Sequence, residues 1–257
     1  MTTTPINLTD QLKTLGLHGI AAGLDDFVAL ATKKRLSPVE MLERFAAVET
    51  QERARRSLER RLSQAKIGRF KPIIDFDWSW PTRIDRDAVE AAVRLDFIER
   101  NGNIVLVAPQ GLGKTMIAKN IAHQAALAGH SVLCVSASQM LLDLGGQDSP
   151  RGLDRRLRHY LSAALLVIDE IGYLSYDNRN ADLLFQVVSR RYENKSIVLT
   201  TNLAFSDWPT IFPNATCATA LIDRLVHHSE VVAIEGESYR RREAESDKKS
   251  RRKKVVA

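Results

Sequence analysis

NIVLVAPQGLGKTMIAKNIAHQAA, residues 103–126, is the stretch that decides the fold of this chain. Its apolar run at 104–107 predicts a buried strand, the glycines that follow predict a tight loop, and the apolar spacing beyond Thr115 predicts a helix. A glycine-rich loop that ends in Gly-Lys-Thr between a strand and a helix is typical of a phosphate-binding site. Backbone N–H groups of the loop and the positive end of the helix then face the anion.

Within this loop we expect Lys114 to contact the β- and γ-phosphates of a nucleotide and the Thr115 hydroxyl to bind Mg²⁺. Ala108 stands where the common pattern has its first glycine, and we expect this small residue to be tolerated. The alternative is a tight turn with an incidental lysine. The residues expected to hold the nucleotide are Pro109, Gln110, Gly111, Leu112, Gly113, Lys114, Thr115 and Met116.

The composition is that of a globular protein, with 44% hydrophobic and 26% charged residues among 257. This length allows one medium domain and a small additional one. The only cysteines, Cys134 and Cys217, form no C-x-x-C pair, which fits a reducing cytosol. The N-terminus lacks a signal pattern and no apolar run approaches about 18 residues, so we expect a soluble, cytoplasmic protein without a membrane segment.

The positive charge is concentrated in two segments. Residues 53–71 hold eight lysines or arginines against one acidic residue, and residues 239–254 hold nine against three. Because the net charge of the whole chain is only +6, the remainder is net negative. This distribution favours a polyanionic partner such as nucleic acid, although a solvated helix face and a disordered tail would give the same pattern. The candidate DNA contacts are Arg53, Arg55, Arg56, Arg60, Arg61, Lys66 and Arg69.

The chain is predicted to contain two folded domains. Residues 1–70 predict a small helical domain, in which Ser37-Pro38-Val39-Glu40 is a capping box that opens a helix. Residues 71–86 mix aromatic residues, prolines and aspartates without a period, and we interpret them as a linker. Residues 87–240 form the predicted α/β domain, and residues 241–257 a basic tail.

The α/β domain is predicted to be a P-loop parallel sheet with helices on both faces. Apolar runs alternate with segments of helical length and pattern, as a parallel sheet covered on both sides requires. A helix over residues 86–100 is expected before the first strand. The predicted strands are residues 104–108, 131–137, 164–169, 196–201 and 231–234.

Two of these strands end in polar residues that suit nucleotide hydrolysis. In the run that ends at Asp169 and Glu170, we expect Asp169 to hold Mg²⁺ through water and Glu170 to activate the attacking water. The glutamate favours hydrolysis over phosphoryl transfer to a substrate. Asn202, after the following strand, would reach the γ-phosphate or the same water. Taken alone, each pattern also describes an ordinary strand end.

The order of these elements resembles the AAA+ ATPases. Asp169-Glu170, Asn202 and Arg224 are similar to the Walker B, sensor-1 and arginine-finger elements of that class. The resemblance implies that Arg224 is donated to the γ-phosphate of a neighbouring subunit. Arg240 matches the place of a sensor-2 arginine that contacts nucleotide, although Arg241 and Arg242 adjoin it.

More narrowly, the chain resembles the IstB-type helper ATPases of insertion-sequence transposition, with the helicase loader DnaC as nearest relative. Residues 221–229 (LIDRLVHHS) and 235–240 (EGESYR) are similar to the family's C-terminal signature. The N-terminal portion, with residues 17–20 (LHGI) and then a basic helix, is also similar to the family, as are residues 75–78 (DFDW) ahead of the ATPase core. The resemblance therefore covers nearly the whole chain.

Membership of that family would imply an ATP- and Mg²⁺-dependent homo-oligomer on double-stranded DNA, associated with the nucleoid when bound. It would recruit and stimulate a cognate transposase, with the helical domain contributing to assembly and to partner or DNA contact. Two alternatives are a replicative helicase loader of the DnaC type and a non-catalytic scaffold that uses ATP only for assembly. The N-terminal region favours the helper over the loader, and the pair Asp169 and Glu170 argues against the scaffold.

Two aromatic clusters have both structural and functional interpretations. His227 and His228 have no cysteine or carboxylate partner at metal spacing in the sequence, so a place on a helix surface is favoured over a metal site. Trp78 and Trp80 would stack on nucleic-acid bases, but beside Phe76 they are better interpreted as anchors of the linker.

Overall fold

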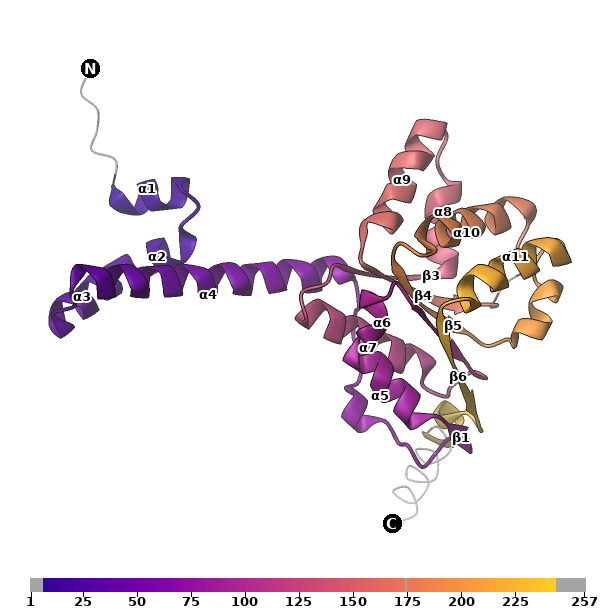
Figure 1. Cartoon of the computed structure of the whole chain (residues 1–257). Helices are drawn as coiled ribbons and strands as arrows, with labels where there is room; N and C mark the ends of the chain where they lie inside the picture. The colour runs from indigo at the N-terminus through magenta and orange to yellow at the C-terminus, as the bar shows by residue number, and fades with distance from the viewer. Residues whose placement is uncertain (1–6, 174, 244–257) are drawn as a thin grey trace, which may run out of the picture. The chain divides into compact units, whose positions relative to one another are not determined.

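The structure, a computed structural model, describes residues 7–173 and 175–243 (Figure 1). The chain divides into two compact units between Arg60 and Arg61, here called the helical unit and the α/β unit. No helix in the described ranges combines the length and the apolar character that a bilayer span requires. The helical unit contains α1 (Leu8–Thr14), α2 (His18–Ala22), α3 (Leu24–Lys34) and most of α4 (Pro38–Ala65).

The long helix α4 begins at the predicted capping box. The Ser37 backbone N–H donates to Glu40 Oε2 at 2.7 Å, and the Glu40 N–H donates to Ser37 Oγ at 3.3 Å. Pro38 occupies the first helical position, where its missing N–H costs no hydrogen bond. These reciprocal contacts satisfy backbone donors that a helix start leaves unpaired, so the capping-box prediction is confirmed.

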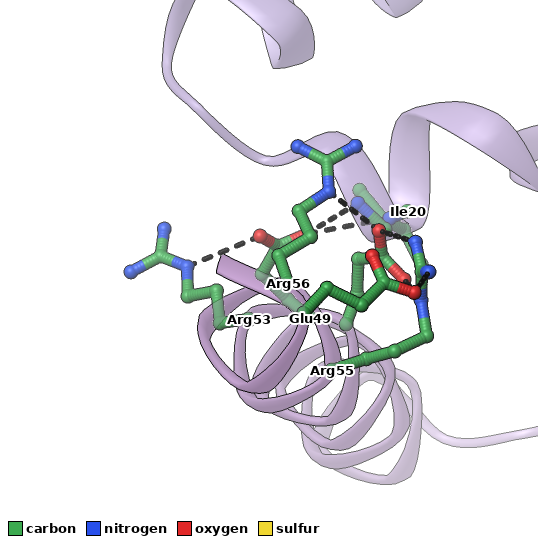
Figure 2. Close-up of polar contacts among 8 residues, drawn as sticks. Ile20, Glu49, Arg53, Arg55 and Arg56 are labelled. Carbon is green, nitrogen blue, oxygen red and sulfur yellow. Dashed lines mark hydrogen bonds and ion pairs between the residues drawn. The ribbon is translucent and has the colours of Figure 1, made fainter. Parts of the chain in front are cut away.

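A buried glutamate fastens α2 to α4. Glu49 is only 5% exposed, and its Oε2 accepts hydrogen bonds from the N–H groups of Gly19 at 2.8 Å and Ile20 at 3.4 Å (Figure 2). Burial raises the pKa of Glu49, but hydrogen bonds from Arg53, Gly19 and Ile20 outweigh it and hold the pKa below its usual value. A Cβ atom at Gly19 would lie 2.7 Å from the Cβ of Glu52, so glycine allows the two helices this close approach.

The α/β unit is a six-stranded sheet in the order β1-β6-β2-β5-β4-β3. All neighbouring pairs are parallel except β1 with β6. The strands are β1 (Arg83–Ile84), β2 (Asn103–Val107), β3 (Val132–Ser136), β4 (Leu165–Ile171), β5 (Ser196–Thr201) and β6 (Ser229–Glu235). The helices are α5 (Arg86–Arg94), α6 (Asp96–Glu99), α7 (Lys114–Leu127), α8 (Ala137–Gly145), α9 (Pro150–Ser162), α10 (Asn178–Arg191) and α11 (Ala215–Val226), with 3₁₀ turns η1 (Ile73–Asp75) and η2 (Phe205–Thr210).

Alternate residues of the central strands face two separate cores. Along β2, Ile104 and Leu106 pack with residues of α5, α6 and α7, whereas Val105 packs with residues of α8, α9, α10 and α11. Figure 1 shows these two groups of helices on opposite sides of the strands. Because successive strand side chains point to opposite faces, an almost wholly apolar strand is what a doubly covered sheet requires. The predicted fold class is confirmed.

The domain boundaries differ from the predicted ones. The division between the units lies before the predicted residue 70, because Ala65 and Ile67 are buried in the core of the α/β unit. The predicted linker, residues 71–86, also belongs to that unit: Phe76 is buried in the same core and Asp85 caps α5. The segment has no secondary-structure period because its regular elements, η1 and the two-residue β1, are too short to show one. Of the predicted tail, residues 244–257 lie outside the described residues.

Smaller differences concern the edges of elements. The predicted helix over residues 86–100 is two helices, since Leu95 adopts the left-handed conformation with φ of 72°. The strand predicted at 231–234 extends over the whole of β6. The two-residue strand β1 was not predicted, because so short a segment has no detectable alternation. The other four predicted strands occur within two residues of their expected bounds.

Candidate nucleotide-binding site

The phosphate loop connects β2 to α7, as the sequence predicts. Gly111 and Gly113 have φ of 82° and 87°, the left-handed region in which glycine is unstrained. A Cβ atom at Gly113 would lie 2.5 Å from Cε2 of Phe76, and one at Gly111 would clash with the Ser238 side chain. Ala108 is not among the described residues with positive φ, and its N–H donates to Thr201 O at 3.1 Å, so this position does not require glycine.

Lys114, the first residue of α7, folds back over the loop. Its Nζ donates to the carbonyl oxygens of Ala108 at 2.6 Å and Pro109 at 2.9 Å. Burial lowers the pKa of Lys114, the charges of Asp169 and Glu170 act to raise it, and that of Arg240 acts to lower it. These four charged side chains therefore lie close enough to influence one another's charge.

A buried threonine joins the two acidic residues at the end of β4. Asp169 Oδ1 accepts hydrogen bonds from Thr115 Oγ1 at 3.1 Å and from Thr200 Oγ1 at 2.5 Å. Thr200 Oγ1 in turn accepts the Glu170 N–H at 2.9 Å, and Thr200 is fully buried. A bulge between Ile168 and Ile171 and a φ of 65° at Glu170 make this geometry possible. Sequence reasoning missed Thr200 because a threonine inside a strand is an ordinary strand residue.

The phosphate loop borders a cavity of about 560 Å³, a size typical of small-molecule sites. Most of the predicted loop and the residues at the strand ends line the cavity. The predicted linker and the segment after β6 form its remaining side, which is rich in aromatic residues and is here called the aromatic wall. The predicted residues at the cavity are Gln110, Gly111, Leu112, Gly113, Lys114, Thr115, Met116, Glu170, Asn202 and Arg240. The additional lining residues are Lys71, Asp75, Phe76, Asp77, Trp80, Pro81, Tyr173, Thr200 and Tyr239.

The aromatic wall is fixed by contacts within the α/β unit. The Trp80 indole N–H donates to Glu237 O at 2.8 Å, and its ring meets Tyr239 edge to face at 5.9 Å. The Trp78 ring packs against Phe76 at 4.7 Å. These contacts support the interpretation of both tryptophans as anchors. In the sequence, the clustered aromatic residues beside Pro81 indicate that this segment packs against the folded domain. They do not indicate that it borders the cavity.

Three predicted site residues do not line this cavity, although Asp169 is hydrogen-bonded to the lining residue Thr115. Pro109 does not line the cavity, although its carbonyl contacts Lys114. Arg224, on α11, is not at the cavity of its own chain: its guanidinium lies over the Phe185 ring at 4.6 Å and donates to Ala220 O at 3.1 Å. The structure therefore assembles the predicted phosphate-loop and strand-end residues, but not the predicted arginine finger, within a single chain.

Several candidate DNA-contact arginines are paired with acids of their own helix. Arg53 contacts Glu49 at 3.1 Å, while Arg55 and Arg56 contact Glu52 at 2.8 and 2.6 Å (Figure 2). Hydrogen bonds from Arg55 and Arg56 lower the pKa of Glu52 to about 2, so it stays charged. Arg61 donates to Ala126 O at 3.0 Å. The positive charge available for phosphates on this segment is thus smaller than the count over residues 53–71 indicates.

Comparison with known structures identifies the fold of the α/β unit. The fold is similar to that of DnaI, with a TM-score of 0.55 at 18% identity over 67% of this chain and 92% of that one. It is also similar to the replication initiator DnaA bound to AMPPCP and single-stranded DNA, with a TM-score of 0.51 at 17% identity over 63% and 52% of the two chains. At these identities the similarity shows the fold, which is that of the P-loop AAA+ proteins.

The sequence comparisons are more specific. The family described as IstB-like ATP binding protein matches residues 10–247, and the chain belongs to this family. A Pseudomonas aeruginosa protein, whose name refers to insertion sequence IS21 and to ATP binding, is 37% identical over 90% of this chain and 88% of its own. A protein of Bacillus thuringiensis subsp. berliner, named likewise for IS232, is 36% identical over 91% and 93%. The predicted family resemblance is confirmed.

Proposed function

We propose that this protein is an ATPase that assists insertion-sequence transposition. It binds ATP with Mg²⁺, assembles as a homo-oligomer on duplex DNA, hydrolyses ATP, and recruits or stimulates a cognate transposase. Family membership and the insertion-sequence names of relatives at 36–37% identity support the role in transposition. The proposed helical domain contributes to assembly and to contact with DNA or the transposase.

The hydrogen-bonded group of Thr115, Asp169, Thr200 and Glu170 is the observation that carries the proposal of hydrolysis. Thr115 Oγ1 donates a hydrogen bond to Asp169 Oδ1 at 3.1 Å, so its lone pairs would be free to bind Mg²⁺ while the Asp169 carboxylate would hold the ion through water. These oxygen groups fit the ion, which when bound would neutralise phosphate charge. Glu170 borders the cavity, where its carboxylate orients a water molecule and accepts the water's proton.

Lys114, Asn202 and Arg240 complete the site on its phosphate side. Lys114 has three N–H donors, of which two contact loop carbonyls, so one remains for a phosphate oxygen. The Asn202 amide and the Arg240 guanidinium line the same cavity. Asn202 holds the attacking water or the γ-phosphate, and Arg240 adds positive charge beside the phosphates.

Arg224 acts across a subunit boundary in this proposal. Its position outside the cavity of its own chain is what a residue donated to a neighbour requires. The ATPase site is therefore complete only in an oligomer, and assembly on DNA controls hydrolysis.

A helicase loader of the DnaC type is a second candidate, with which the fold of the α/β unit is also compatible. The sequence relatives favour the transposition role, because their identity is about twice as high as that of DnaI and extends over about 90% of this chain. A non-catalytic scaffold would not need Glu170 at the cavity. Transposition assays with the integrase-like protein from a neighbouring reading frame, compared with helicase-loading assays, separate the first two roles.

Two variants that interrupt different steps test the proposal. Lys114→Ala removes the counter-charge of the phosphates and is expected to abolish ATP binding. Glu170→Gln is expected to bind ATP and Mg²⁺ normally, to hydrolyse ATP about 10²–10⁴-fold more slowly, and to stay longer on duplex DNA. The measurements are fluorescent-nucleotide binding, steady-state hydrolysis with and without DNA, and DNA dissociation. A wild-type hydrolysis rate in Glu170→Gln would contradict the role of Glu170.

A further inference from the structure

Three side chains with metal-ligating atoms lie at the edge of the sheet opposite the phosphate loop. Glu193 lies in the turn between α10 and β5, and His227 and His228 lie between α11 and β6. Strands β5 and β6 both run parallel to β2, so these turns precede the amino ends of their strands, whereas the phosphate loop follows the carboxyl end of β2. The ligand atoms of the three exposed residues lie within 4.8 Å of one another.

Hydrogen bonds from residues at the start of β2, the strand between β5 and β6, hold the backbone of both turns. Asn101, just before β2, donates from Nδ2 to Glu193 O at 3.1 Å. Asn103, the first residue of β2, donates from its N–H to His228 O at 2.8 Å and from Nδ2 to Leu225 O at 3.3 Å. Since β2 pairs with both β5 and β6, the positions of the two turns are fixed relative to each other. Only side-chain rotation is then needed to arrange the three ligand atoms.

The side-chain distances come close to those of a metal site. Ligand atoms about 2.0–2.2 Å from a tetrahedral zinc ion lie about 3.3–3.6 Å apart. His228 Nε2 and Glu193 Oε1 are already 3.5 Å apart. His227 Nδ1 and the Tyr192 hydroxyl are 2.7 Å apart. When Nδ1–H donates to the phenol oxygen, the lone pair on His227 Nε2 is free for a metal, the arrangement in which a neighbouring group orients a histidine ligand.

We propose that Glu193, His227 and His228 bind one divalent transition-metal ion of the zinc class, with water in the fourth position and Tyr192 orienting His227. Two imidazoles and one carboxylate suit Zn²⁺, whereas Mg²⁺ prefers an octahedral shell of oxygen ligands. The site is therefore distinct in chemistry and in position from the magnesium site of the nucleotide cavity. Its ion joins the end of α11, the helix that carries Arg224, to the turn that follows α10.

The test is a zinc titration of the full-length chain without an affinity tag, after treatment with a chelator. A chromophoric chelator competes for the ion, with millimolar MgCl₂ present throughout. We expect one Zn²⁺ per chain in the wild type and an affinity loss of at least about 100-fold in His227→Ala and in His228→Ala. Tyr192→Phe, which keeps the ligands and removes their orienting hydroxyl, is expected to lose about 10–100-fold. His18→Ala, at an exposed histidine of the helical unit, is the matched control and keeps the wild-type affinity.

Zinc X-ray absorption of the wild-type complex provides a second readout that does not depend on the folding of variants. Two imidazole nitrogens with additional oxygen ligands in the first coordination shell are the expected result. Equal zinc affinity in the wild type and the two histidine variants would overturn the proposal, as would a shell with no imidazole. An affinity loss in His18→Ala as large as that in His227→Ala would also overturn it, because binding would then be non-specific.

Discussion

The helical unit and the α/β unit differ in how far their interactions are completed inside the chain. The α/β unit buries two extensive cores, one on each face of its sheet. Among the described residues of the helical unit, the buried core cluster contains Leu12, Ile20 and Ala21, with a few partly buried neighbours. Large apolar side chains such as Leu15, Val39 and Leu42 remain more than 60% exposed there. The α/β unit thus packs around its own cores, whereas the helical unit leaves large apolar side chains exposed, as its proposed role in assembly or partner contact would require.

Arg224 is expected to show the largest effect, because in the proposed function it completes the site of a neighbouring subunit. Arg224→Ala should reduce DNA-stimulated ATP hydrolysis by about 10³–10⁵-fold, the usual contribution of an arginine that stabilises charge on a transferred phosphoryl group. ATP binding by the variant should stay near the wild-type value. Hydrolysis and fluorescent-nucleotide binding are the measurements. Arg190→Ala, at an arginine that forms an ion pair with the partly exposed carboxylate of Asp154, is the control and should keep near-wild-type rates.

Arg191 tests how much the buried hydrogen bonds inside the α/β unit contribute to its stability. It is 1% exposed, and its guanidinium donates to the carbonyls of Tyr160, Ala163, Ala164 and Ser196, while burial lowers its pKa to about 10. Arg191→Met should lower the free energy of unfolding by about 3–5 kcal/mol, because several buried carbonyls lose their donor. Urea denaturation measures this loss. The neighbouring Arg190→Met should change stability by less than about 0.5 kcal/mol, and equal losses in both variants would contradict the assignment.

Thr200 tests whether the two acidic residues depend on one hydroxyl. Thr200→Val keeps the shape of the side chain but removes the donor to Asp169 and the acceptor for the Glu170 N–H. We expect kcat to fall by about 10–100-fold and the Mg²⁺ requirement to rise, as when a group that orients a metal ligand is removed. Thr200→Ser should restore most of both. A purely structural role would lower stability in Thr200→Val without moving the Mg²⁺ dependence.

The smallest predicted effect is a difference in DNA binding between Arg60 and the ion-paired Arg55 of α4. Each phosphate contact contributes about 0.9 to the slope of log K against log salt for duplex DNA. Arg60→Ala should flatten the slope by about that amount, whereas Arg55→Ala should change it less, because Arg55 already pairs with Glu52 and Glu59. Fluorescence anisotropy at several salt concentrations measures both. Equal slopes in the wild type and Arg60→Ala would place the DNA site elsewhere.

Most residues of the nucleotide site could be predicted from the sequence, because each of its motifs consists of residues that are close together in the chain. A strand, a glycine loop and a helix adjoin one another at Lys114, and Asp169 and Glu170 directly follow an apolar run. The pairs Glu49–Arg53 and Glu52–Arg56 were also predictable, since they are four residues apart on a helix. Their acidic partners Glu49 and Glu52 precede the basic segment 53–71, so the charge of that segment does not include them.

Other features depend on tertiary context that no local pattern carries. Thr200 reaches both acidic residues only because a bulge in β4 alters the register with β5. Phe76 lies against the phosphate loop although they are far apart in the chain, and its own segment has no period. Leu95 takes a left-handed conformation that glycine usually supplies, so the break between α5 and α6 has no sequence signal.

Mixing two inactive variants tests most directly the central claim that the active site is shared between subunits. Arg224→Ala keeps an intact phosphate loop, and Lys114→Ala keeps the arginine, so a mixture on duplex DNA should regain part of the ATPase activity. Replacing the second partner by the double variant Lys114→Ala/Arg224→Ala should abolish this recovery, since no arginine is then present. Absence of recovery in the first mixture, with co-assembly on DNA confirmed, would contradict a composite site.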